Sequence, residues 1–193
     1  MCPPIPPSTS RTLQAVGARR PTPGSPARSE LVSTLRRLSS SPQAFVSLFD
    51  ARSIAGERHL LSAWAHLGRG RARGQDRLRD RGAEFALFVA GDDQLPRALA
   101  KVGVSEDTEQ FVLVAEKPLD PIALLQEFHL VEDPTAYPRS IDVATLERLG
   151  ITEADRQVIP PEGWEGLVLE RVALVDLSAP HAGPGSSKSA PHR

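Results

Sequence analysis

Residues 44–67 read AFVSLFDARSIAGERHLLSAWAHL, and this stretch decides the fold class. It begins with an aliphatic and aromatic run, which is typical of a buried strand. Ser53 follows at a position suited to capping a helix. Leu60, Trp64 and Leu67 then recur at helical spacing. A strand that leads directly into an amphipathic helix predicts an α/β domain.

Apolar periodicity and helix caps predict the other elements in the same way. The apolar run 84–90 fits a buried strand or a buried helix equally well, because periodicity does not separate the two. The remaining expected elements are strands at 12–18 and 111–115, a helix at 29–38, a helix capped by Asp92 or Asp93 and ended by Gly103, helices that begin after Asp120, Asp142 and Thr152, and a final amphipathic helix within 162–177. The prediction is one α/β (α+β) domain at 11–177, a small sheet packed with several helices, between disordered tails at 1–10 and 178–193.

The composition narrows the functional classes. The chain has 193 residues, of which 40% are hydrophobic and 24% charged, as in an ordinary globular domain. Its net charge of −1 gives no overall field for capturing nucleic acid, so any such role needs a local patch. Cys2 is the single cysteine, which excludes a disulfide framework. No run approaches the roughly 20 apolar residues that span a bilayer, so we expect a cytoplasmic protein without a membrane partner.

Catalytic and metal-binding patterns are not evident. His59 and His66 lie seven positions apart, and no nearby carboxylate or thiolate completes a metal site, so we interpret them as core or polar-edge histidines. Glycine-rich nucleotide loops and nucleophile elbows do not occur at the required positions. We therefore expect a protein that is not an enzyme and holds no cofactor. A small enzyme with a scattered site remains an alternative.

Arginines are concentrated between residues 69 and 81. Gly68 and Gly70 are expected to end the preceding helix, which leaves the arginines on a mobile loop. Guanidinium groups on such a loop suit contacts with RNA phosphates. The alternative is a solvated, charged loop that binds nothing in particular, and the lack of interleaved aromatic residues favours it slightly. The candidate RNA-binding residues are Arg69, Arg71, Arg73 and Arg77.

The order of the motifs resembles that of a known family. The passages that carry the resemblance are 45–61, 84–91, Gln94-Leu95, Ala98-Leu99, Gly103-Val104, 111–115 and 169–177. In the order of these passages and in the lengths of the gaps between them, the chain resembles the small kinase-binding subunits of the KEOPS complex. One departure is the pair Asp92-Asp93, because the family usually has a basic or neutral polar residue just before the position of Gln94.

The resemblance implies an α/β fold without a catalytic centre of its own. Family members bind the N-terminal lobe of the kinase-like ATPase subunit. Some of them also help to recruit transfer RNA, through its 3′ CCA end, for threonylcarbamoyladenosine modification. The partner contact is expected on the final helix and at Gln94, Leu95, Ala98 and Leu99, although an ordinary core position is an equal alternative for Leu95 and Ala98. A free-standing RNA-binding module is the second interpretation of the chain.

Overall fold

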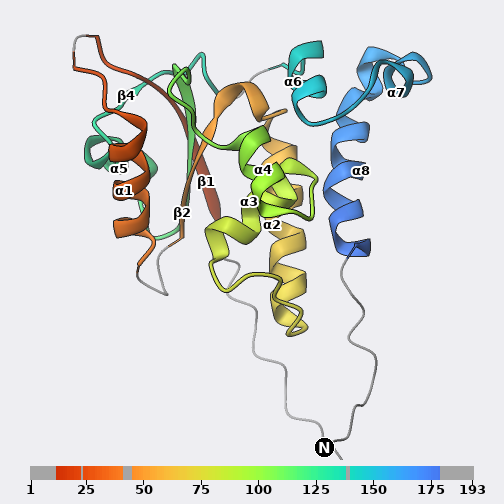
Figure 1. Ribbon diagram of the computed structural model, residues 1–193, viewed down its shortest axis with the longest axis horizontal. Coiled ribbons are helices and arrows are strands. Elements are labelled where there is room, and N and C mark those ends of the chain that lie inside the picture. The colour runs from red at the N-terminus through yellow and green to blue at the C-terminus, as the bar shows by residue number, and fades with distance from the viewer. Residues whose placement is uncertain (1–11, 23, 41–44, 138–139, 179–193) are drawn as a thin grey trace, which may run out of the picture.

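A computed structural model describes residues 12–22, 24–40, 45–137 and 140–178, which form a single α/β domain around an antiparallel sheet (Figure 1). The strand order is β2-β3-β1-β4, so the long strand β3 lies inside the sheet. The predicted strands are confirmed, and the short β4 is additional. The strands are β1 (Leu13–Arg19), β2 (Val46–Asp50), β3 (Gln110–Glu116) and β4 (Val131–Glu132). The fold class is therefore the predicted one.

Helices cover both faces of the sheet, which gives three layers (Figure 1). The helices α1 (Arg28–Leu38) and α5 (Pro121–Glu127) lie on one face. The other face carries the larger group, made of α2 (Glu57–Ala72), α3 (Arg81–Ala90), α4 (Leu95–Val102) and α8 (Trp164–Leu177). The short helices α6 (Val143–Arg148) and α7 (Glu153–Gln157), with the 3-10 turns η1 (Ala51–Ser53) and η2 (Pro161–Gly163), complete the domain.

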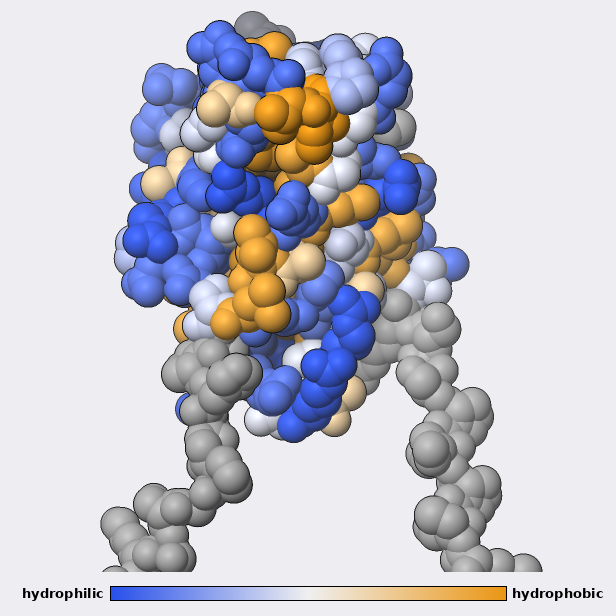
Figure 2. Space-filling model, turned by 90° about the vertical axis from the view of Figure 1, so that its right-hand side faces the viewer, coloured by the Kyte–Doolittle hydropathy of each residue, from blue (hydrophilic) through white to orange (hydrophobic). Residues whose placement is uncertain are grey.

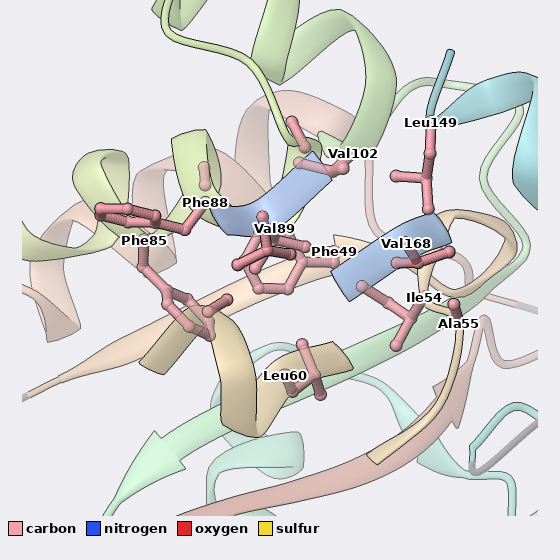
Figure 3. Close-up of a cluster of buried hydrophobic side chains, with 14 of the residues drawn as sticks. Phe49, Ile54, Ala55, Leu60, Phe85, Phe88, Val89, Val102, Leu149 and Val168 are labelled. Atoms are coloured by element: carbon pink, nitrogen blue, oxygen red, sulfur yellow. The ribbon is translucent and has the colours of Figure 1, made fainter. Parts of the chain in front are cut away.

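The helix α3 forms the centre of the larger core. The segment 84–90 lies within this helix, which decides the open question in favour of a helix, and each of its residues is buried. Asp80 caps the helix by accepting a hydrogen bond from the Ala83 amide, and Gly91 ends it in the left-handed conformation with φ of 59°. Figure 3 shows side chains from the sheet and from the neighbouring helices converging around α3. Periodicity could not identify this helix because all its sides are apolar or buried.

Helix starts that carry their signal locally are confirmed. Asp120 accepts a hydrogen bond from the Ile122 amide at the start of α5, and Asp142 accepts one from the Thr145 amide at the start of α6. Thr152 forms a capping box with Asp155 at the start of α7. These caps involve residues two or three positions apart, so the sequence alone contains the whole interaction.

Two expected boundaries of α2 are wrong. Ser53 does not cap α2, because its buried hydroxyl donates to the Lys101 carbonyl oxygen and Gly56 occupies the cap position. Gly68 lies inside α2, which continues past Gly70 to Ala72. In both cases, contacts with distant segments override the local signal. Gly103 ends α4 as predicted, but its φ of −73° is not the left-handed conformation that glycine favours at a helix end.

The predictions for the tails concern residues that are not described. Cys2, residues 1–10 and residues 179–193 fall outside the described ranges. The structure therefore leaves the expected domain limits as predictions.

A buried histidine connects α2 to α3. Its Nδ1 accepts a hydrogen bond of 3.2 Å from the Ala55 amide, and its Nε2–H donates to the Val89 carbonyl oxygen at 2.9 Å. This residue, His59, has no exposed surface. Burial lowers the pKa of His59 from 6.5 to about 4, and the hydrogen bond to Val89 offsets only part of that effect. His59 is therefore the neutral core histidine that the sequence indicated.

The first prediction is that His59 makes the domain sensitive to mild acid. Between pH 6.5 and 4 the unfolded chain protonates His59 and the folded chain does not, so stability present above pH 6.5 is lost as the pH falls. The cost at pH 4.5 is about 2–3 kcal/mol. His59→Gln keeps a donor and an acceptor but removes the titration. Urea unfolding at pH 7 and pH 4.5 should show a smaller loss of stability in the variant, and equal losses would contradict the assignment.

Candidate partner-binding surfaces and the arginine run

Contrary to the sequence prediction, only part of the arginine run is a loop. Residues 69–72 form the last turn of α2, residues 73–80 form a tight connection, and Arg81 begins α3. The Gly70 carbonyl oxygen accepts hydrogen bonds from the amides of Arg73 and Gln75, at 3.1 and 3.0 Å, which closes the end of α2. Glycine inside a helix costs about 1 kcal/mol relative to alanine. The packing of α2 against α3 and α8 offsets that cost.

Arg71 binds to the domain rather than pointing into solvent. Its guanidinium lies 2.7 Å from the Glu84 carboxylate, which is almost fully buried in α3. It also donates to the Leu78 carbonyl oxygen at 2.8 Å. Glu84 accepts a further hydrogen bond, at 2.9 Å, from the Arg77 amide. Arg71 and Glu84 thus hold the connection between α2 and α3 in place.

Two further arginines of the run are also directed inwards. Arg77 donates a hydrogen bond to the Val175 carbonyl oxygen of α8, and its guanidinium lies 6.0 Å from the centre of the Phe88 ring. Arg81 pairs with Glu116 at 3.1 Å and lies over the rings of Phe45 and Trp64. Cation–π contacts of this kind stabilise a buried guanidinium. Sequence patterns do not indicate these partners, because they lie far away along the chain.

The exposed arginines of the run form a smaller set than expected. Of the four candidate RNA-binding residues, Arg69 and Arg73 are exposed, whereas Arg71 and Arg77 are partly buried and hydrogen-bonded. Arg79, in the connection before α3, is exposed as well. Any contact between this region and a nucleic-acid backbone therefore depends first on Arg69, Arg73 and Arg79.

The four candidate partner-binding residues, at the start of α4 and within it, differ in their exposure to solvent. Ala98 is fully buried in the core, and Leu95 packs partly against the same core. Gln94 and Leu99 are exposed, Leu99 with 48% of its surface accessible. For Ala98 the structure supports the core alternative, so a substitution there tests folding rather than binding. Leu99 and Gln94 remain available to a partner.

The acidic pair before α4 is neutralised locally. Arg97 lies 3.0 Å from both Asp92 and Asp93, and Lys101 lies 3.1 Å from Asp92. Burial would raise the pKa of Asp92, but hydrogen bonds from the Gln94 amide, Lys101 and Arg97 outweigh it and lower the pKa. Neither Asp92 nor Asp93 caps α4 directly, because Gln94 occupies the cap position. Two acids and two bases here leave little net charge for attracting or repelling RNA.

The predicted apolar stripe of α8 is buried, and the outward side of the helix carries exposed leucines beside charged residues. Leu167, Val168, Val172 and Val175 are buried against the core. Leu174 and Leu177 nevertheless point outwards, with 42% and 75% of their surfaces accessible. Figure 2 looks onto the side of the molecule that carries α8, where apolar areas are interspersed with hydrophilic ones.

A shallow hollow adjoins this outward side. It measures about 170 Å³ and lies between α8 and the segment around α7. Its lining combines three apolar side chains with two acidic residues and one basic residue, namely Ile151, Leu167, Leu174, Asp155, Glu170 and Arg171. Val158, at the end of α7, is 79% exposed. We call the outward residues Leu174 and Leu177, together with this hollow, the α8 surface. In the sequence, the α8 surface is indicated only by Leu174 and Leu177, which lie outside the predicted apolar stripe of this helix.

The two histidines of α2 do not form a metal site. His59 is buried as described, and His66 pairs with Asp176 of α8 and stacks on Phe88 at 5.9 Å between ring centres. Within the described ranges, no group of three or more His, Cys, Asp or Glu side chains is arranged to hold a metal ion. None of the helices described here is both long enough and apolar enough to cross a bilayer.

Comparison with models of known protein families and with curated proteins gave no match for this chain.

The second prediction tests the structural role of the arginine run. Arg71→Gln leaves the buried Glu84 carboxylate without its main counter-ion, so we expect a loss of about 2–4 kcal/mol in the free energy of unfolding. Arg69→Gln, on the exposed side of the same helix turn, should change it by less than about 0.5 kcal/mol. Urea denaturation of the two variants provides the measurement. Equal effects would mean that Arg71 is as free in solution as Arg69.

Proposed function

We propose that this protein is a non-catalytic accessory subunit of a KEOPS complex, which binds the kinase-like ATPase subunit and helps to recruit transfer RNA. The observation that carries the proposal is the α8 surface. Its leucines, Leu174 and Leu177, belong to the passage 169–177, in which the sequence resembles the kinase-binding subunits of that complex. An apolar side chain as exposed as Leu177 on a regular helix gains stability when a partner covers it.

The neighbourhood of the α8 surface is consistent with a protein partner. The helix α8 packs on α2 and α3, and α3 packs on α4, so α8 and the exposed Leu99 belong to the same helical layer. Charged residues border the apolar ones, among them Glu170 and Arg171. An apolar centre with a polar border is the usual composition of a protein–protein interface. The proposed kinase-like lobe would cover Leu174 and Leu177.

The third prediction concerns this contact. Leu174→Glu places a charge in the proposed interface and should abolish co-elution with the kinase-like subunit in gel filtration, while the melting temperature of the free protein changes little. Leu99→Glu tests whether the contact extends to α4. Ile122→Glu is the matched control, because Ile122 is 52% exposed on α5, in the opposite layer. Co-elution that survives Leu174→Glu would refute the proposed interface.

The proposed RNA contact rests on the three exposed arginines of the run. Arg69, Arg73 and Arg79 lie at the end of α2 and in the connection that follows, where they are accessible to a phosphate backbone. Such contacts position RNA without reading its sequence, so recognition of the CCA end would need a separate site.

The fourth prediction is that replacing Arg69, Arg73 and Arg79 with glutamine weakens transfer-RNA binding. The dependence of log K on log salt should flatten by up to about 2 units, at roughly 0.7 for each single-strand phosphate that the variant no longer neutralises. A triple variant of α1, at Arg28, Arg36 and Arg37, removes the same charge from the opposite layer and is the control. Discrimination against RNA without its CCA end should persist. If the two triple variants weaken binding equally, the effect comes from the overall charge of the protein, and a specific contact at Arg69, Arg73 and Arg79 is refuted.

A further inference from the structure

Among the described residues, one edge of the sheet is open over part of its length. The Thr12 carbonyl oxygen accepts a hydrogen bond from the Lys117 amide, so even-numbered residues of β1 direct their backbone groups towards β3. The backbone groups of the odd-numbered residues point away from β3, as the hydrogen bond from the Asp133 amide to the Gly17 carbonyl oxygen shows. On this side β4 pairs only with Ala18 and Arg19. In the described part of the chain, no strand pairs with 13–16 there.

A hollow of about 280 Å³ lies along this open stretch. Three consecutive residues of β1, 13–15, line it, although side chains on a strand alternate between faces. The hollow therefore follows the strand backbone at the sheet edge. Its other walls are Glu57, Leu60 and Leu61 of α2, and Tyr137. The segment 133–137, which ends at Tyr137, crosses β1 at Gly17 so closely that a Cβ there would lie 2.4 Å from the Asp133 carbonyl oxygen.

The lining of the hollow combines apolar side chains with polar groups, one of which carries a negative charge. Leu61 is 45% exposed, and Leu13 and Ala15 are partly buried. Glu57 is the charged group among the lining residues. Burial raises the pKa of Tyr137 to about 12, with a further contribution from Glu57, so the phenol keeps its proton at neutral pH. The volume lies just below the range of small-molecule pockets and suits a single bulky side chain.

We propose that the open edge of β1 and its hollow bind an extended segment of another protein as an added strand. The outward amides and carbonyl oxygens of Leu13 and Ala15 would pair with the backbone of that segment, as in β-augmentation. An apolar side chain of the segment would enter the hollow. A lysine or arginine two positions away, on the same face of the added strand, would meet Glu57. This site lies on β1 and the N-terminal half of α2 and does not rest on the proposed function.

The test uses the full chain and three synthetic hexapeptides, Thr-X-Thr-Arg-Thr-Arg, in which X is valine, leucine or phenylalanine. Nuclear magnetic resonance titration should shift the amide signals of Leu13 and Ala15 and slow their hydrogen exchange when peptide is added. Peptides with glutamate in place of arginine should bind more weakly, because of Glu57. Absence of binding by all three peptides up to about 1 mM, or shifts located elsewhere, would overturn the proposal.

Two protein variants separate the backbone from the hollow. Ala15→Pro removes an amide that points away from β3, so the β1–β3 hydrogen bonds remain while peptide affinity falls about tenfold. Leu61→Ala should weaken binding by about fivefold, because the peptide then buries less apolar surface. Ile122→Ala, in the opposite layer, is the matched control, with 52% exposure against 45% for Leu61. Equal affinity of Leu61→Ala and Ile122→Ala would refute the role of the hollow, even if Ala15→Pro fails to fold.

Other occupants of the edge give distinct results. Slow exchange of the Leu13 and Ala15 amides in the free monomer would show that the chain covers its own edge, and would overturn the proposal. The same protection in a dimer, detected by analytical ultracentrifugation, would assign the edge to a second copy and would overturn it as well.

Discussion

A single buried carboxylate links the sheet to the segments around it. Asp50, at the end of β2, has no exposed surface and accepts hydrogen bonds from Arg52 of η1, from the hydroxyl of Thr108 and from Arg148 of α6. Burial would raise the pKa of Asp50, but the hydrogen bonds from the side chain and amide of Arg52, with the nearby charge of Arg148, lower it overall, so the group stays charged at neutral pH. A buried charge is tolerated only when its donors are in place. The positions of β2, η1, α6 and the segment before β3 therefore depend on one another.

Much of the fold could be predicted because its signals are local. The caps Asp120, Asp142 and Thr152 lie within three residues of the amides that they bind. The end of α2 could not be predicted, because the helix continues through Gly68 and Gly70 on the strength of contacts with α3 and α8. The segment 84–90 was ambiguous for the opposite reason: it is buried all round, so its sequence has no polar face to show a period.

The surface was less predictable than the fold. The sequence shows that arginines are concentrated near residue 75, but the partners that turn Arg71 and Arg77 inwards, Glu84 and the Val175 carbonyl oxygen, belong to other helices. Likewise, Ala98 and Leu99 are neighbours in sequence, and only the orientation of α4 makes one a core residue and the other a surface residue. Which side of a helix faces a partner is a tertiary property. Charge and periodicity indicate candidates, and packing selects among them.

The central position of α3 has a consequence for synthesis on the ribosome. The apolar residues around Phe85 and Phe88 emerge well before β3, and α8, which covers one side of α3, is translated last of the helices described. A nascent chain therefore exposes its most apolar helix until almost the whole domain has left the exit tunnel. Domains fold as units during translation, and exposed apolar segments of this kind are the ones that chaperones bind. We therefore expect the domain to complete its packing only after α8 has been translated and can cover α3.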